Sequence, residues 1–258
     1  MTENPPAHVV IVVEENHSYS EIAGNPNAPF INSLMHRGAN FTSYHGVQHP
    51  SQPNYLDLFS GANQGVTNDS CPHTFSAPNL ASELFKKHLT FAGYAEDLPS
   101  TGYVGCTSGG VFGVGTNYAR KHCPWVDFSN VPATSSKPFT SFPKDYNTLP
   151  TISIVIPNLQ NDMHSGSVQA ADNWLRRNIR PYTEWAKAHN SLLIVTWDED
   201  DQSADNVIPT LYVGPMVKTG TYRQSLNHFN TLRTIEDLYG LSHLGKSRTE
   251  LPISYIWT

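Results

Sequence analysis

Four runs of apolar, mostly β-branched residues stand out, because polar or turn-forming residues stop each of them abruptly. They span residues 8–13, 151–156, 191–197 and 209–213. Uninterrupted runs of this length are typical of strands buried on both faces of a sheet. Helical patterns lie between them, at residues 28–37, 53–59, 80–87, 168–189 and 230–239. This alternation predicts an α/β fold with a mostly parallel central sheet and helices on both faces.

The chain of 258 residues is of ordinary length for one α/β domain, and we expect a single domain over residues 1–258. Residues 61–147 differ from the rest because they are rich in Gly, Pro, Ser, Thr and Asn, with one clear strand pattern at 89–94. We expect this segment to be a loop-rich insertion above the sheet that forms a lid or a substrate wall.

Composition excludes two classes of partner. The formal net charge is -6 and no Lys/Arg-rich run occurs, so non-specific nucleic-acid binding is not expected. The longest apolar stretch, Val9–Val13, is too short to cross a bilayer, so stable membrane insertion is not expected either. It also lacks the flanks of a signal peptide. We expect a secreted or cell-envelope protein whose signal is absent from this chain, while a cytoplasmic location and the oligomeric state stay open.

The three cysteines, Cys71, Cys106 and Cys123, cannot all pair within one chain. One disulfide with one free thiol, or three thiols, are both compatible with this count. Cys71 and Cys106 lie in loop-like sequence, where a bridge would indicate an oxidising compartment.

Two of the predicted strands end in acidic clusters. The first is followed by Glu14, Glu15 and Asn16, and the third by the run Asp198-Glu199-Asp200-Asp201. Ligands of open parallel sheets bind beyond the carboxyl ends of the strands, where these clusters would face each other. An oxygen-only set of Glu15, Asn16, Asp198 and Glu199 suits a hard divalent cation. The alternative is that the acidic run is a solvated turn.

Ser51 precedes a helical pattern, with Pro53 two residues later. The structural interpretation is a helix N-cap. The same position also directs backbone N–H groups and the positive end of the helix dipole at a group on the hydroxyl, which suits a phosphate. A nearby metal would make this hydroxyl a nucleophile. Asn54, just inside the helix, could donate to the same phosphate.

Histidine and basic residues supply the remaining candidates. His164 follows a predicted strand end and could protonate a leaving alcohol, a role that His122 could also take. Arg120, Lys121 and His122 form the only compact basic cluster, which suits a phosphate dianion.

Five strings of this sequence, in order, resemble a known family. They are VVIVVEENHSY, HPSQPNYLDLFSG, PNLQNDMHSGS, IVTWDEDD and NHFNTLRTIEDLYGL, and they cover residues from about His8 to Leu241. The resemblance is to the phosphoesterase family of bacterial acid phosphatases and non-specific phospholipases C, within the alkaline-phosphatase-like superfamily.

The resemblance implies a nucleophile at Ser51, with metal ligands at Glu15-Asn16 and at Asp198-Glu199. It implies phosphate-site histidines that match His122 and His164 less securely. His228 sits where the superfamily often has a late metal ligand, and we keep it as a second-rank candidate together with Asp162 and Asp200. The chain lacks the C-terminal domains of phospholipase C members, so small phosphomonoesters are expected rather than large lipids.

The expected function is metal-dependent hydrolysis of phosphate monoesters through a phosphoseryl intermediate. Ca²⁺ or Mg²⁺ is favoured, and Zn²⁺ becomes possible if histidine participates. One alternative is a phospholipase C-type phosphodiesterase that binds phosphocholine-like head groups against an aromatic wall of Tyr103, Tyr118 and Trp125. A second alternative is a calcium-stabilised binding module without enzymatic activity.

Overall fold

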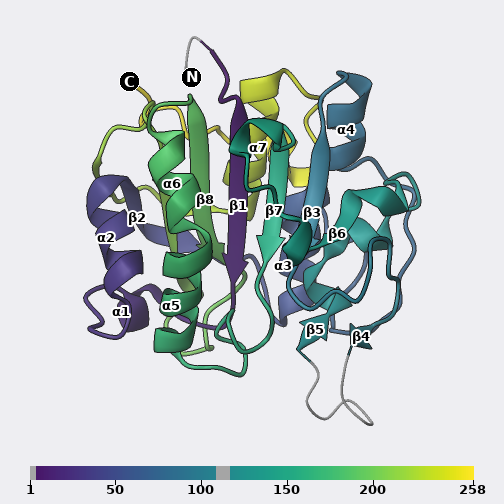
Figure 1. Cartoon of the computed structure of the whole chain (residues 1–258), viewed down its shortest axis with the longest axis horizontal. Coiled ribbons are helices and arrows are strands. Elements are labelled where there is room, and N and C mark those ends of the chain that lie inside the picture. The colour runs from purple at the N-terminus through teal and green to yellow at the C-terminus, as the bar shows by residue number, and fades with distance from the viewer. Residues whose placement is uncertain (1–3, 109–116) are drawn as a thin grey trace.

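A twisted central sheet runs through the molecule (Figure 1). The computed structural model describes residues 4–108 and 117–258. Strand order in the sheet is β10-β2-β9-β8-β1-β7-β3-β6, with β11 beside β2. The bounds are β1 His8–Glu14, β2 Ala39–His45, β3 Phe91–Ala95, β6 Ser136–Pro138, β7 Ile152–Ile156, β8 Ser191–Trp197, β9 Val207–Val213, β10 Gly220–Tyr222 and β11 Leu226–Asn227.

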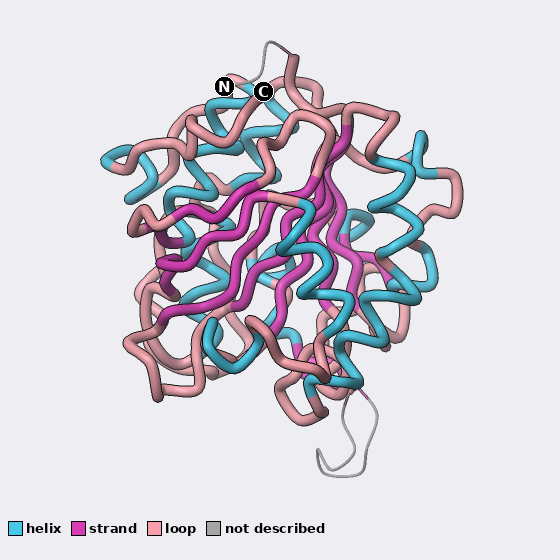
Figure 2. Tube along the Cα trace, turned by 90° about the vertical axis from the view of Figure 1, so that its left-hand side faces the viewer, coloured by secondary structure: helices cyan, strands magenta, loops and turns pink. Residues whose placement is uncertain are grey.

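Helices cover both faces of this sheet, as Figure 2 shows. The helices α5 and α6 lie on one face with α2, while α3 and α7 lie behind the sheet in Figure 1. Their bounds, with those of the shorter helices, are α1 Tyr19–Ile22, α2 Pro29–Arg37, α3 Ser51–Ser60, α4 Leu80–Lys86, α5 Val168–Asn178, α6 Arg180–Ala186 and α7 His228–Tyr239. The predicted α/β class is confirmed.

The central strands are buried on both faces, as the uninterrupted apolar runs predict. Residues 9–13 of β1 are at most 1% exposed, and all seven residues of β8 are buried. β1 pairs in parallel with β7 on one side and with β8 on the other. All four predicted strands are present, because no other arrangement buries so many consecutive β-branched side chains.

The structure contains three features that the sequence pattern did not predict. β9 runs antiparallel to both β8 and β2, and β2 was not predicted because its sequence ANFTSYH mixes polar with apolar residues. The helical pattern at 168–189 is two helices, α5 and α6. Pro181 lies in the first turn of α6, where its missing N–H is tolerated, and it could not continue α5.

The segment 61–147 contributes to the sheet as well as lying beside it. Its strand β3 pairs with β7 and with β6, both in parallel. A two-stranded sheet of β4 (Thr107–Ser108) and β5 (Tyr118–Ala119) lies at the lower edge of Figure 1. Residues 109–116 of the expected insertion lie outside the described residues. Among the described residues, no helix combines the length and apolar character that a membrane span needs.

Glu236 of α7 gives the stability a predictable pH dependence. It is buried and accepts hydrogen bonds from the Ser247 hydroxyl at 2.6 Å and the Leu244 N–H at 2.9 Å. Burial raises its pKa to about 7, against the opposing effect of these donors. Between the unfolded pKa and about pH 7 the folded chain therefore binds more protons than the unfolded chain, and stability falls as pH rises.

We therefore expect Glu236→Gln to lose this part of the pH dependence. In urea unfolding, the unfolding free energy of the variant minus that of the wild type should become more positive as pH rises from about 5 to 8. A constant difference over this range would show that Glu236 keeps an ordinary pKa.

Candidate active site

The two acidic strand ends meet at one edge of the sheet. Glu14 of β1 lies in register with Trp197 of β8, so the residues after each strand are neighbours. The Asp198 N–H donates to the Glu14 carbonyl at 3.0 Å, and the Asn16 N–H donates to the Asp198 carboxylate at 3.2 Å. Asn16 has a φ of 56°, a left-handed conformation that asparagine tolerates better than most residues. Parallel pairing thus brings the two clusters into contact.

Ser51 is the first residue of α3, and its hydroxyl lies between two of these carboxylates. Its Oγ is 3.0 Å from Oε2 of Glu15 and 3.0 Å from Oε1 of Glu199, and it can donate to one of them at a time. The N-cap position belongs to Pro50 and not to Ser51. The Ser51 side chain is therefore free of a capping role, and it sits buried beside the acidic cluster at the positive end of the helix.

The electrostatics of this cluster fit a bound cation. Glu15, Asp198 and Glu199 are each at most 5% exposed. Burial, with the charges of Glu15 and Glu199 added to it, raises the pKa of Asp198 well above its ordinary value. Oδ2 of Asp198 is buried, with no hydrogen-bond partner among the described residues. Carboxylates held this close need protons or a cation between them, and an all-oxygen donor set suits a hard divalent ion.

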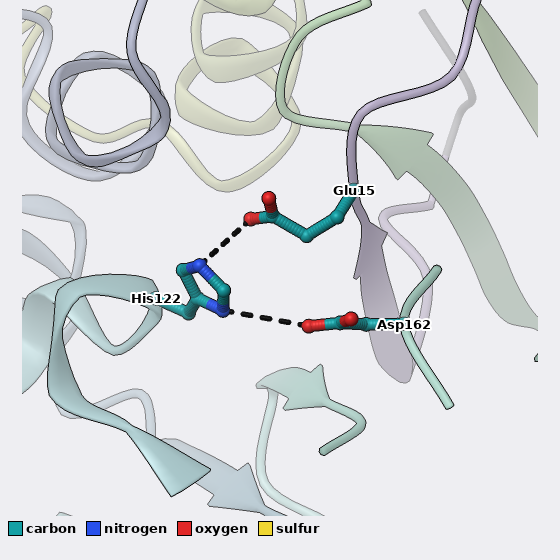
Figure 3. A group of neighbouring side chains, drawn as sticks. All are labelled: Glu15, His122 and Asp162. Carbon is teal, nitrogen blue, oxygen red and sulfur yellow. Dashed lines mark ion pairs between the residues drawn. The ribbon is translucent and has the colours of Figure 1, made fainter. Parts of the chain in front are cut away.

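His122 bridges two acids on the other side of Glu15, as Figure 3 shows. Its Nε2 is 2.9 Å from Oε1 of Glu15 and its Nδ1 is 3.4 Å from Oδ2 of Asp162. The three side chains are buried, and their ligand atoms lie within 4.8 Å of one another, so this group could also bind a metal. Burial opposes the charge on His122, but Glu15 and Asp162 outweigh it and raise the His122 pKa to about 9. A protonated imidazolium at neutral pH therefore offsets one of the two negative charges of this pair.

Lys121 and the start of α3 share one carboxylate, that of Asp69. The Lys121 ammonium donates to Oδ2 at 2.8 Å, and the Gln52 N–H donates to Oδ1 at 3.0 Å. The hydrogen bond to Asp69, together with the charges of Glu15 and Asp198, raises the pKa of Lys121 against the effect of burial. Asp69 thus pairs with the Lys121 ammonium and also caps the helix that carries Ser51.

His164 lies on the same side of the cluster but is open to solvent. Its ring centroid is 5.9 Å from that of His122, and its Nδ1 is 3.0 Å from the Ser165 hydroxyl. Partial burial lowers the His164 pKa. Of the two histidines proposed to protonate a leaving group, His164 is the one with access to a substrate.

Two residues predicted to bind phosphate have other roles in the structure. Asn54 accepts from the N–H groups of Val47 and Gln48 and donates to two carbonyls, so its amide holds the turn before α3. Arg120 is 6% exposed, and its guanidinium donates to Asp127 at 2.9 Å and to the carbonyls of Val104 and His73. The structure therefore gives no support to a phosphate contact by either residue, because their polar groups already have partners that the sequence does not reveal.

The structure also shows the surroundings of the three second-rank candidates, which are Asp200, His228 and Asp162. Both carboxylate oxygens of Asp200 accept backbone N–H groups of the following turn, at 2.7–3.0 Å, so Asp200 shapes the loop. His228 is buried, and its Nε2 lies 2.8 Å from the Asp198 carbonyl. Burial lowers the His228 pKa to about 4, so the ring is neutral and supports the backbone of Asp198. Asp162 lies against His122, as described above.

Two further residues contact the cluster and were not predicted. Tyr55 donates to Glu15 at 2.6 Å from one turn further along α3. His49 contacts Glu199 through Nδ1, and its Nε2 is 3.5 Å from Asp200. Tyr55 could have been found from its spacing of four from Ser51 on the helix, whereas His49 lies before the helix and its position in the sequence carries no such signal.

The expected aromatic wall for a choline head group is not available. Trp125 and Tyr118 are at most 2% exposed, and Trp125 packs directly over the Cα of Gly93. Their rings belong to the core, which explains their presence in a loop-rich segment. Tyr103 is only partly buried, but its hydroxyl donates to the Thr107 carbonyl.

Cys71 and Cys106 form a disulfide, and Cys123 is a buried free thiol. The bridge closes a loop over a sequence separation of 35. Replacing both bridged cysteines with serine should cost about 3–4 kcal/mol of unfolding free energy, by the loop-entropy relation. Urea unfolding measures this loss. A reductant should shift the wild type and leave the double variant unchanged, and equal stability of the two proteins would contradict the prediction.

Comparison with known proteins agrees with this arrangement. The phosphoesterase family model matches residues 25–242. A phosphatidylinositol-3-phosphatase of Mycobacterium tuberculosis is 52% identical over 97% of this chain and 83% of that protein. A phosphate-repressible acid phosphatase of Penicillium chrysogenum is 30% identical over 90% of this chain, which spans only 58% of the fungal protein.

Solved structures share the fold at low sequence identity. A Vibrio parahaemolyticus protein of the alkaline phosphatase superfamily has a TM-score of 0.61 at 13% identity, over 98% of this chain and 72% of that one. The phosphonate monoester hydrolase of Silicibacter pomeroyi has a TM-score of 0.63 at 12% identity, over 98% and 78%. The family model and the close relative together show that the chain belongs to the phosphoesterase family and is a hydrolase acting on phosphoric ester bonds.

Proposed function

We propose that this chain hydrolyses phosphate monoesters through a phosphoseryl intermediate on Ser51. The observation that carries the proposal is the position of the Ser51 hydroxyl, 3.0 Å from carboxylate oxygens of both Glu15 and Glu199, at the start of α3. The positive end of the α3 dipole favours a phosphate group on this hydroxyl, while Asp69 already accepts the Gln52 N–H and Pro53 has no N–H to offer. The adjacent carboxylates can take its proton as the hydroxyl attacks.

The residues proposed to hold a divalent cation are Glu15, Asn16, Asp198 and Glu199, next to the Ser51 hydroxyl. Oxygen donors alone favour Ca²⁺ or Mg²⁺. Such a cation, when bound, would lower the pKa of the serine hydroxyl and offset the negative charge of the phosphate. His122 then has a separate task, because its contact with Glu15 and Asp162 fixes the Glu15 carboxylate from the side away from Ser51.

The first half of the reaction is an in-line displacement at phosphorus. The Ser51 oxygen forms a bond to phosphorus while the bond to the ester oxygen breaks, and the departing alkoxide takes a proton from His164. Lys121 faces the negative charge of the transferring group from the side of Asp69. Water then attacks the phosphoserine, the bond between phosphorus and the serine oxygen breaks, and inorganic phosphate leaves.

The lowered pKa of His164 supports activity at acidic pH, where its ring carries the proton that the leaving alkoxide needs. A phosphoinositide is one candidate substrate, since a relative that is 52% identical bears the name phosphatidylinositol-3-phosphatase. The Cys71–Cys106 disulfide supports a location in an oxidising compartment such as the cell envelope or the exterior.

The experiment is to compare p-nitrophenyl phosphate with bis(p-nitrophenyl) phosphate under the same conditions. The proposal expects kcat/KM for the monoester to exceed that for the diester by about 100-fold or more, because a divalent cation held beside Ser51 would favour the dianion. A preference for the diester would support the phosphodiesterase alternative. If neither ester is hydrolysed, the proposal is contradicted.

A further inference from the structure

A cavity of about 510 Å³ opens beside the candidate site and has no role in the reaction described so far. It shares two wall residues with that site, Lys121 and His164. Lys121 pairs with Asp69, which accepts the N–H of Gln52 next to Ser51, and the His164 ring lies 5.9 Å from that of His122. A phosphate held at Ser51 would therefore direct its ester oxygen, and the alcohol attached to it, towards this cavity.

Part of the cavity lining is apolar. The Cys71–Cys106 disulfide forms part of it, and Ala119 of β5 and Leu159 after β7 complete it. Disulfide sulfur atoms and aliphatic carbons offer no hydrogen bonds, so this wall favours the apolar face of a ligand. Polar side chains such as Gln160 also line the cavity, where they could bind hydroxyl groups on the ring of a ligand.

The charges in the cavity wall are already neutralised within the protein. Asp69 lies in the wall and pairs with Lys121 at 2.8 Å. The volume falls within the range of about 300–1,000 Å³ that ligand pockets usually have. An alcohol with a single ring fits such a space, whereas a two-carbon alcohol would leave most of it filled with water.

We propose that this disulfide-walled cavity is the subsite for the alcohol part of the substrate, and that it selects phosphate monoesters of ring-bearing alcohols over those of short linear alcohols. The inference rests on the proposed function, because it assumes that the phosphate is attacked by Ser51. Leu159 and the Cys71–Cys106 bridge are then specificity determinants, since they contact the alcohol and not the phosphate.

The test compares two primary alkyl esters, cyclohexylmethyl phosphate and ethyl phosphate, whose leaving alcohols are chemically similar. The wild type should show a kcat/KM that is roughly 10–100-fold higher for the ring ester, since each buried methylene favours binding. Leu159→Trp fills the cavity and should reduce this ratio to within about twofold. Leu251→Trp places the same side chain at an exposed position outside the cavity and should keep the wild-type ratio.

The ratio is insensitive to a general loss of active protein, because both esters are measured on the same preparation. Ala119→Leu adds volume to the cavity wall from β5. It replaces Leu159→Trp in this test if that variant does not fold. A ring preference that persists in both filled variants overturns the subsite. Equal rates for both esters in the wild type, with p-nitrophenyl phosphate still hydrolysed, overturn the subsite and leave the phosphatase proposal standing. Hydrolysis of no monoester at all overturns both.

Discussion

Ser51→Ala should lower kcat for p-nitrophenyl phosphate by about a thousandfold or more, because the reaction would lose the oxygen that attacks phosphorus. The fold should persist. Ser51 is buried, but it does not cap the helix, because the N-cap position belongs to Pro50. Its hydroxyl contacts only the acidic side chains of Glu15 and Glu199 among the partners described above, so its loss leaves the helix intact. Steady-state kinetics with purified variant and wild type measure the loss.

Ser60→Ala is a matched control for this variant. Ser60 is the last residue of the same helix, is also buried, and donates to the Leu56 carbonyl. It should keep most of the activity, with a stability loss of about 1 kcal/mol from the lost hydrogen bond. Comparable kcat values for Ser51→Ala and Ser60→Ala would show that Ser51 is not the nucleophile.

Removal of divalent cations should abolish turnover and also destabilise the fold. Without a cation, the buried carboxylates of Glu15, Asp198 and Glu199 repel one another, and burial together with the charge of Glu15 raises the pKa of Asp198 and of Glu199. A cation present at 100 times its Kd contributes about 2.7 kcal/mol to unfolding free energy. We therefore expect a chelator to remove activity and lower Tm, and Ca²⁺ or Mg²⁺ to restore both.

Asp198→Asn provides the control for this effect. The variant keeps the size of the side chain but loses one anionic ligand, so it should bind the cation weakly. Its Tm should respond little to the chelator. A chelator that left wild-type activity unchanged after exhaustive dialysis would contradict metal dependence, and an equal Tm shift in the variant would place the cation elsewhere.

The part of the site that the sequence reveals is the part built from strand ends. The apolar run of β1 stops at Glu14-Glu15-Asn16, and that of β8 stops at Asp198-Glu199. Buried parallel strands of similar length end at the same edge of a sheet, so both clusters could be placed there from the pattern alone. The pairing of Glu14 with Trp197 in the structure satisfies that expectation.

The rest of the site depends on contacts between segments that are far apart in the chain. Asp69 caps the Ser51 helix from a loop held by the Cys71–Cys106 bridge, and its own neighbours give no sign of that role. Arg120 had the charge expected of a phosphate ligand, but Asp127 and two carbonyls already satisfy it. Residue type predicts what a side chain can bind, whereas only the fold decides what it does bind.

The measurement that tests the central claim most directly is the stereochemical outcome at phosphorus. The phosphoryl group of a monoester made chiral with three oxygen isotopes is transferred to an acceptor alcohol, and the configuration at phosphorus in the product ester is determined. Two in-line displacements, first by Ser51 and then by the acceptor, predict overall retention. Inversion would mean a single displacement without a phosphoseryl intermediate and would contradict the role assigned to Ser51.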